Sequence, residues 1–477
     1  MKTNKKTHGS QLALKGGSYS LIVTVVVLAI LIVVNIFASI LPAALTKYDI
    51  SSSKLYSITS NTKVVVNNLQ QDVTIYWVVQ ADAEDDIIEN LLGKYESLSE
   101  HIKVVKKNPD VFPAFTEQYT DEMVPNNSLI VESDERSRYI SYNDIYLAEP
   151  DMYSYTYTTS FDGEGAITSA IDYVVTEDLP QLYVLEGHGE AELPSTFADA
   201  IEKENIVINT LSLLTVDEIP EEADAIMIYA PESDISEEEK TMLADYTANG
   251  GKLLVMAGPV EGTVLTNLNS LLSDYNIEMA EGIVVEGDRN HYAFGYPYSL
   301  VPEMEDSNIT APLIEENYHP ILPLSQGMTI GTTEKGTVTE LMTTSDLAFS
   351  KTAGFELETY EKEDGDIDGP FTMAVSIETS GAGQIIWFSA SDFLNDMYNA
   401  FSSGANVDLA MNSLSSLIGE REAIAIRSKS LNYNYLTITA STSNTLKALM
   451  IGVFPLVYLG IGIFIIIRKR GRQNETI

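Results

Sequence analysis

The residues best suited to chemistry follow segments that the pattern of apolar residues predicts to be strands. They are Glu186, Gly187, His188, Gly189 and Glu190 after one strand, Pro231 after another and Asp392 after a third. A histidine near carboxylates can bind a metal ion or act as an acid and a base. Ligands of open parallel sheets bind beyond the carboxyl ends of the strands, where such segments meet. We therefore predict that these residues form a candidate ligand crevice.

The same residues have a structural alternative, and the signatures of the common enzyme classes are missing. The two glycines can form a tight turn in which His188 makes an internal hydrogen bond. The sequence has no GxSxG, HExxH or GxxxxGK[ST] motif, and its 477 residues include no cysteine. Cysteine nucleophiles, disulfides and thiolate metal sites are thereby excluded. We expect no catalytic residue, metal site or cofactor; the alternative is a hydrolase or metal-dependent enzyme that uses His188, Glu190 and Asp392.

Alternating strands and helices position the candidate residues. Strands are expected at 181–185, 206–211, 225–229, 252–256 and 384–388, and helices at 195–204 and 236–248. Ser236 and Glu239 form a capping box at the start of the second helix. This alternation predicts an α/β domain built on a mainly parallel, doubly wound sheet. We place the domain at residues 161–420, with an insertion at about 267–372.

A smaller α/β unit is expected before this domain. Residues 73–79 are apolar and rich in β-forming side chains, residues 85–101 carry apolar side chains at helical spacing, and residues 102–105 form a second short strand. This order is typical of a βαβ unit. We assign residues 47–160 to a membrane-proximal α/β domain.

Two uncharged apolar runs, at residues 21–40 and 448–467, each have a basic flank. Each run spans about 30 Å as a helix, which is enough to cross the hydrocarbon core of a membrane. Because basic flanks stay on the cytoplasmic side, the tails at 1–20 and 468–477 are predicted to be cytoplasmic. A first span with its exit at 21–46, a linker at 421–447 and a second span at 448–467 would then leave both α/β domains outside the cytoplasm.

The charge balance restricts the partners. The sequence has 28 basic and 69 acidic residues, for a net charge of -41 at pH 7. Nucleic-acid binding requires clustered Lys and Arg that neutralise phosphates, so nucleic acid is not an expected partner. Membrane lipid is expected to contact the two apolar runs.

Several motifs occur in a characteristic order along the chain. They are YDIS at 48–51, LYSIT at 55–59, LYVLEGHGE at 182–190, ADAI at 223–226, GGKLL at 250–254, FSASDFL at 388–394 and NVDLAMN at 406–412. In this order they resemble the GldG-family auxiliary component of ABC transport systems, named for gliding motility. The resemblance implies an extracytoplasmic sheet domain similar to class I glutamine amidotransferases but without their chemistry. It also implies association with an ABC permease and a separate cytoplasmic ATPase.

The expected function combines these features. We expect a non-enzymatic, membrane-anchored auxiliary subunit of an ABC transport system in the bacterial envelope, whose extracytoplasmic domains bind a transported substrate, a partner protein or an envelope component. Besides the extracytoplasmic hydrolase or metal-dependent enzyme, a membrane receptor or sensor is the remaining alternative.

Overall fold

A computed structural model describes residues 25–34, 55, 57–151, 156–419 and 429–430, together with short stretches between 450 and 463. Residues 25–34 form a helix with exposed apolar side chains. Within these described ranges, no helix has the length and apolar character needed to cross a membrane. Most of both expected spans, at 21–46 and 448–467, and of the linker at 421–447 lies outside the described residues.

The smaller unit is built on a four-stranded sheet in the order β2-β1-β3-β4. The strands are β1 Val73–Val78, β2 Ile102–Lys107, β3 Ser128–Glu132 and β4 Ser137–Ile140. Strand β1 runs parallel to β2 and antiparallel to β3, and helix α4 Asp86–Leu98 connects β1 to β2. The expected βαβ order is therefore present.

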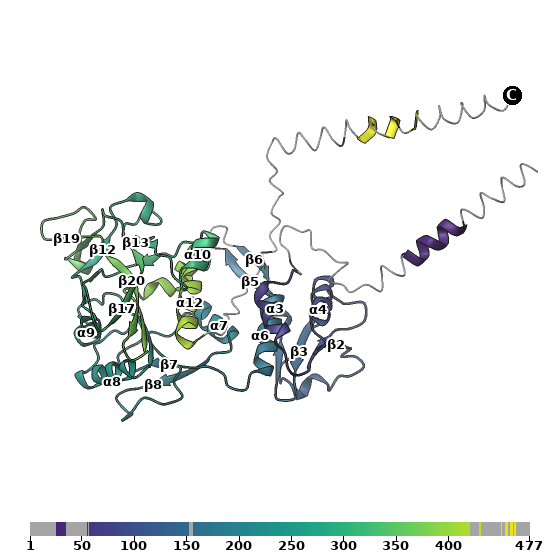
Figure 1. Ribbon diagram of the computed structural model, residues 1–477, viewed down its shortest axis with the longest axis horizontal. Coiled ribbons are helices and arrows are strands. Elements are labelled where there is room, and N and C mark those ends of the chain that lie inside the picture. Colours follow the sequence, from purple (N-terminus) through teal and green to yellow (C-terminus); the bar gives the residue numbers. More distant parts are fainter. Residues whose placement is uncertain are drawn as a thin grey trace, which may run out of the picture.

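Two further helices belong to the smaller unit. They are α3 Ser60–Asn67 and α6 Gly163–Val175 (Figure 1). Helix α6 packs on the sheet, and α3 packs on α6 and α4. Helix α6, which the sequence pattern assigns to the larger domain, buries Ile167, Ile171 and Val174 in one core with Trp77 and Tyr95. The reason is that α6 follows the hairpin of β5 Tyr146–Asp151 and β6 Thr156–Phe161, which returns the chain to the small sheet before the connection to the larger one.

The larger unit contains a ten-stranded sheet, one side of which consists of parallel strands. The parallel strands are β8 Val207–Leu211, β7 Gln181–Leu185, β9 Ala225–Tyr229, β10 Lys252–Met256 and β21 Gln384–Phe388, in that spatial order. Four of these strands have the bounds expected from the sequence, and β8 begins one residue later than expected. The mixed α/β architecture with a parallel sheet is thereby confirmed.

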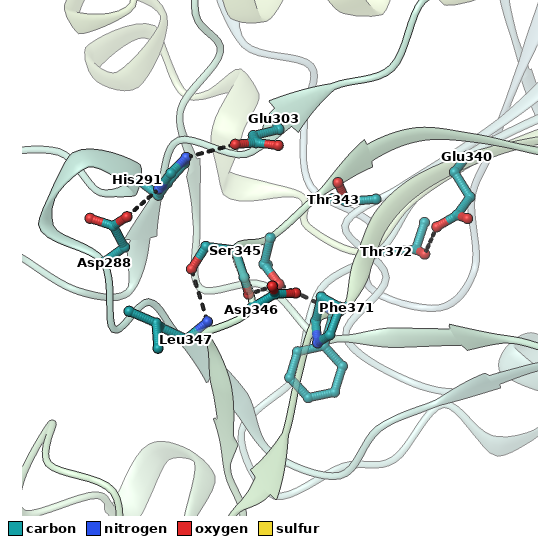
Figure 2. Close-up of a pocket in the computed structure, with 12 residues that line it drawn as sticks. Asp288, His291, Glu303, Glu340, Thr343, Ser345, Asp346, Leu347, Phe371 and Thr372 are labelled. Atoms are coloured by element: carbon teal, nitrogen blue, oxygen red, sulfur yellow. Dashed lines mark hydrogen bonds and ion pairs between the residues drawn. The ribbon is translucent and has the colours of Figure 1, made fainter.

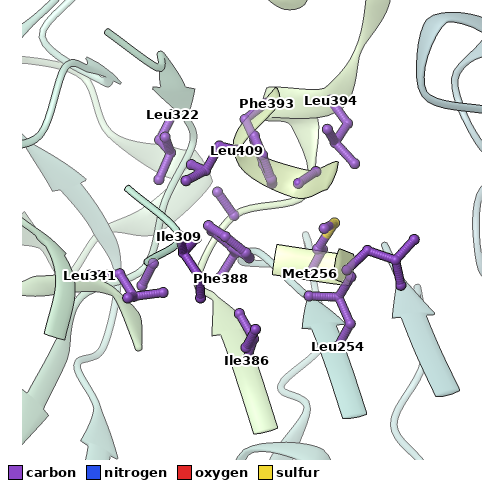
Figure 3. Close-up of a cluster of buried hydrophobic side chains, with 14 of the residues drawn as sticks. Leu254, Met256, Ile309, Leu322, Leu341, Ile386, Phe388, Phe393, Leu394 and Leu409 are labelled. Carbon is purple, nitrogen blue, oxygen red and sulfur yellow. The ribbon is translucent and has the colours of Figure 1, made fainter. Parts of the chain in front are cut away.

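Helices cover both faces of the larger sheet. Helices α7 Ser195–Lys203 and α12 Ala405–Ile418 contribute to one buried cluster, and α8 Glu237–Ala248 and α9 Thr266–Ser273 contribute to another (Figure 1). Figure 3 shows side chains of β10 and β21, including Leu254 and Ile386, in the first cluster together with Phe393 and Leu409. Neighbouring residues on each strand alternate between the two clusters because successive side chains point to opposite faces of a sheet.

The expected insertion extends the sheet and adds two small sheets beside it. Strand β20 Thr372–Thr379 pairs antiparallel with β21, and β17 Gly336–Thr343, β16 Met328–Ile330, β11 Ile277–Met279 and β14 Glu303–Met304 continue the sheet. The small sheets comprise β12 Ile283–Val285, β18 Phe349–Lys351 and β19 Ile367–Asp368, and β13 Ser299–Leu300 with β15 Leu322–Pro323. The remaining elements are α5 Tyr142–Ile145, α10 Ala311–Glu316, α11 Asp396–Phe401 and β22 Lys429–Ser430.

Candidate functional site

The predicted crevice residues at the end of β7 form a tight turn around His188. Gly187 and Gly189 have φ angles of 126° and 77°, in a region that glycine occupies without the steric cost of a side chain. The His188 imidazole is buried, with Nδ1 at 3.2 Å from Glu190 Oε1 and Nε2 at 3.1 Å from Glu239 Oε2. Both ring nitrogens are therefore already engaged by protein carboxylates.

The backbone N–H and C=O groups of His188 are also hydrogen-bonded. The His188 N–H donates to Glu190 Oε2 at 2.7 Å, and the His188 carbonyl oxygen accepts from the backbone N–H groups of Glu232 and Ser233. Pro231, the residue before them, is buried. The loop after β9 is thus fastened to the turn after β7, and the two predicted segments do meet.

Glu239 completes this cluster, although it was not among the predicted site residues. It lies in the first turn of α8, where its Oε2 accepts from Ser236 N–H and its own N–H donates to Ser236 Oγ. The capping box in the sequence located Glu239 at the start of a helix, but not beside His188. Burial alone would raise the pKa of Glu239; the hydrogen bonds from Ser236 and the neighbouring His188 outweigh it and lower that pKa.

This pKa shift gives a testable pH dependence. A carboxyl group whose pKa is lowered by folding stabilises the protein above its unfolded pKa, here 4.5, and that stabilisation is lost as the pH falls through the folded value. We expect Glu239→Gln to lower the free energy of unfolding at neutral pH, and the difference from wild type to shrink below pH 4.5. Urea denaturation over a pH series measures this. Glu237→Gln, which alters an exposed residue of the same helical turn, is the control and should change stability by less than about 1 kcal/mol.

Asp392 stands apart from the His188 cluster. Among the described residues, no hydrogen bond or ion pair links its carboxylate to His188 or Glu190, and desolvation raises the pKa of Asp392. It lies instead near Tyr229 at the end of β9. Burial and the negative charges of Asp392 and Asp396 raise the pKa of Tyr229 to about 12. The strand ends therefore hold two separate groups of polar residues, one around His188 and one around Tyr229.

Asp396 has a structural role in the second group. Its carboxylate accepts from Ser195 Oγ at 2.8 Å, Thr196 Oγ1 at 2.7 Å and Thr196 N–H at 3.1 Å. Pro194, the residue before α7, provides no side-chain cap, so Asp396 supplies the acceptor for the first turn of that helix. These hydrogen bonds also lower the pKa of Asp396, against the opposing effect of desolvation.

We expect Asp396→Ala to destabilise the larger unit by about 1 kcal/mol, the usual cost of losing a helix cap. Asp396→Asn retains an acceptor oxygen and should lose less. Urea denaturation followed by pulsed hydrogen exchange compares the two variants in peptides from α7. Equal midpoints for wild type and Asp396→Ala would contradict the capping role.

A separate cavity of about 580 Å³ lies where the insertion strands meet. Figure 2 shows His291 between Asp288 and Glu303, with Nδ1 at 3.3 Å from Asp288 Oδ2 and Nε2 at 3.2 Å from Glu303 Oε1. The N–H of Asn290 and the nearby His291 hold the pKa of Asp288 below its usual value, against desolvation. The residues that line the cavity include no Lys or Arg. Its surface therefore disfavours anionic ligands.

The geometry of the described residues bears on metal binding and on the role of His188. Within the part of the chain that the structure describes, no three or more His, Asp or Glu side chains are arranged to hold a metal ion. In the turn after β7 the imidazole is closed in by Glu190 and Glu239. This arrangement favours the turn interpretation of His188 over the acid-base interpretation.

A further polar site joins residues 57–62, before strand β1, to strand β22 near the C-terminal end of the described chain. Glu164, at the start of α6, is 2% exposed. Its Oε1 accepts from Thr59 N–H at 2.6 Å and Thr62 Oγ1 at 2.8 Å, and its Oε2 accepts from Lys429 Nζ at 2.8 Å. Lys429 also donates to the Ser57 carbonyl at 2.9 Å. We call Ser57, Thr59, Thr62, Glu164 and Lys429 the tether cluster, because they lie between the two expected spans in sequence and meet in space.

Comparisons with known proteins give two family matches. Residues 179–413 match the family described as "ABC-type uncharacterized transport system", and residues 52–147 match a domain of unknown function (DUF7088). No curated protein matches the chain. The first match covers the parallel strands of the larger sheet and the turn around His188, whereas the second covers the small sheet.

Similar solved structures are remote. The mmIFT52 N-terminal domain is 15% identical with a TM-score of 0.38, and the match covers 50% of this chain and 98% of that one. PurLQS from Thermotoga maritima is 8% identical with a TM-score of 0.26, covering 50% and 100%. Glutamine amido transferase from Methylobacillus Flagellatus is 11% identical with a TM-score of 0.25, covering 50% and 95%. These scores carry no argument for an amidotransferase-like sheet, which stays a prediction. The family match over residues 179–413 supports an auxiliary component of an ABC-type transport system.

Proposed function

We propose that the chain is a non-enzymatic, membrane-anchored auxiliary subunit of an ABC transport system, related to the GldG family. The match of residues 179–413 to an ABC-type transport system is the observation that carries this proposal. In it, the two described units lie outside the cytoplasm and bind a substrate, a partner protein or an envelope component. An ABC permease and a cytoplasmic ATPase are the partners.

The tether cluster supports the anchoring part of the proposal. The residues that follow the first apolar run and those that precede the second both bind Glu164. The two chain segments that lead toward the expected spans therefore meet at one buried carboxylate. The basic flanks at 1–20 and 468–477 support an orientation with both tails in the cytoplasm.

The closed geometry around His188 supports a function without catalysis. A general acid or base must reach the proton that it transfers, yet both His188 nitrogens lie within 3.2 Å of protein carboxylates. Asp392, the third residue of the enzyme alternative, has no described interaction with this cluster. This separation of Asp392 from His188 favours the non-enzymatic proposal over the hydrolase alternative.

Co-purification tests the transport function. The tagged chain is extracted in a mild detergent, and the recovered proteins are identified by mass spectrometry. We expect a multi-span permease and an ATPase in amounts comparable with the tagged chain. A matched control carries an unrelated apolar segment of equal length in place of residues 448–467 and should recover less permease. Recovery of neither transport subunit with the unaltered chain would refute the proposal.

A further inference from the structure

A cleft of about 1150 Å³ lies between the two units. Asn68 and Gln70, after helix α3, and Asp172, in α6, line it on the side of the smaller unit. Asn412 and Ser415 of helix α12 line it on the side of the larger unit. Ligand sites occur preferentially at such junctions, and typical small-molecule pockets have volumes of about 300 to 1,000 Å³. The cleft is large enough for a ligand bigger than a single metabolite.

Side-chain amides from both units dominate its polar lining. They belong to Asn68, Gln70, Gln71, Asn308 and Asn412. Four of these amides, those of Gln70, Gln71, Asn308 and Asn412, each donate one hydrogen bond to a protein oxygen. Because a side-chain amide has two N–H donors and one carbonyl acceptor, each keeps a donor and an acceptor that can pair with the C=O and N–H of a peptide group. Within the described residues, the side chains of Asn68 and Ser415 have no hydrogen-bond partner. Apolar lining residues, such as Val65 and Ile418, alternate with the amides and can contact the side chains of a peptide.

The charge of the lining restricts the ligand further. The charged lining residues are Asp172, Glu177 and Glu204, and no Lys, Arg or His lines the cleft. Phosphorylated ligands and acidic peptides would bring uncompensated negative charge next to these carboxylates. The lining also contains no aromatic side chain on which a nucleobase could stack.

Hydrogen bonds beside the cleft join the two units. Asn205, which is 4% exposed and directly between the lining residues Glu204 and Ile206, donates through Nδ2 to the Ser169 carbonyl and to Asp172 Oδ2, each at 2.9 Å. These hydrogen bonds connect the segment after α7 of the larger unit with α6 of the smaller one. A ligand seated above them contacts both units at once and favours one arrangement of the junction.

We propose that this cleft binds a short linear peptide that carries a positive charge. The amides recognise its backbone, the apolar residues contact its uncharged side chains, and the carboxylates attract its cationic group. This inference deepens the proposed function by naming the ligand class, and it rests on that function only for its role in transport. Binding itself is a property of the isolated chain, so its failure is distinct from a failure to recover the transport subunits.

Calorimetry with the full chain in detergent tests the proposal. The probes are three capped tetrapeptides, Ala-Val-Lys-Ala, Ala-Val-Ala-Ala and Ala-Val-Glu-Ala. We expect the lysine peptide to bind at least about tenfold more tightly than the glutamate peptide, with the uncharged peptide between them. Ser415→Trp and Asn68→Trp each place a large ring in the cleft from opposite walls and should weaken the lysine peptide by at least about tenfold.

The control is Thr241→Trp, which makes a comparable change on the exposed face of α8 and should leave the affinity unchanged. Because Ser415→Trp or Asn68→Trp could disturb folding, the thermal midpoint of each variant is measured alongside. The proposal is overturned if no peptide binds, if the glutamate peptide binds as tightly as the lysine peptide, or if folded Ser415→Trp and Asn68→Trp bind like Thr241→Trp.

Discussion

Lys429→Met should lower the free energy of unfolding of the smaller unit by about 3 to 5 kcal/mol, the usual cost of leaving a buried charge without its partner. Glu164 is 2% exposed, and the Lys429 side chain is 15% exposed. Without Lys429, the Glu164 carboxylate keeps the donors Thr59 and Thr62 but is buried without a countercharge. The whole tether cluster should therefore loosen.

Adding Glu164→Gln to Lys429→Met separates the effect of the unpaired Glu164 charge from the effect of losing the packing of the Lys429 side chain. In the double variant with Lys429→Met, the buried site holds no charge, while the Gln oxygen still accepts from Thr59 and Thr62. We expect the double variant to be more stable than Lys429→Met alone. Urea denaturation followed by pulsed hydrogen exchange measures both in peptides from β1 and α6.

The matched control for the tether cluster is Lys335→Met. Lys335 pairs with Asp274 at the surface, where the side chains are 64% and 55% exposed, so this change should cost less than about 1 kcal/mol. An equal loss in Lys335→Met and Lys429→Met, or no loss in either, would contradict the account of the buried pair.

His188→Ala should destabilise the larger unit by about 2 to 4 kcal/mol. The change removes the imidazole that contacts Glu190 and Glu239, whose side chains are 5% and 3% exposed, and a buried polar group left unpaired costs about 1 to 3 kcal/mol. It also opens a cavity between the turn after β7 and helix α8. The unfolding midpoint in urea, read in peptides from β7 and α8, measures the effect.

His101→Ala is the control for this second variant. His101 pairs with Asp72 at the surface of the smaller unit, where the Asp72 side chain is 90% exposed, so its loss should change stability by less than about 1 kcal/mol. A His188→Ala variant as stable as wild type would contradict the structural role of the turn and revive the acid-base interpretation.

The parallel strands of the larger sheet were predictable from sequence because their signals are local. Strands β7, β9, β10 and β21 are continuous apolar runs bounded by turn residues, and such runs are typical of parallel strands covered on both faces. The capping box of Ser236 and Glu239 likewise depends on residues three apart. The insertion strands were not predictable individually, since several contain only two or three residues.

The polar sites depended on contacts that sequence spacing does not reveal. His188 and Glu239 are 51 positions apart, and Glu164 and Lys429 are 265 positions apart. The sheet topology brings residues 186–190 close to the loop that begins at Pro231. The orientation of the His188 ring, in contrast, depends on the φ angles of the neighbouring glycines. Helix α6 was misplaced because its apolar face fits either sheet by pattern, and only the hairpin before it determines which one.

Site-specific labelling tests the central claim, that both described units lie outside the cytoplasm while both tails lie inside. The chain has no cysteine, so single cysteines can be introduced without background. Met123→Cys places a thiol at a residue that is 93% exposed, and Thr3→Cys and Asn474→Cys place one in each tail. In intact cells or spheroplasts, a membrane-impermeant maleimide should label only Met123→Cys, and the tails should react only after lysis. Labelled tails and a protected Met123→Cys before lysis would contradict the account.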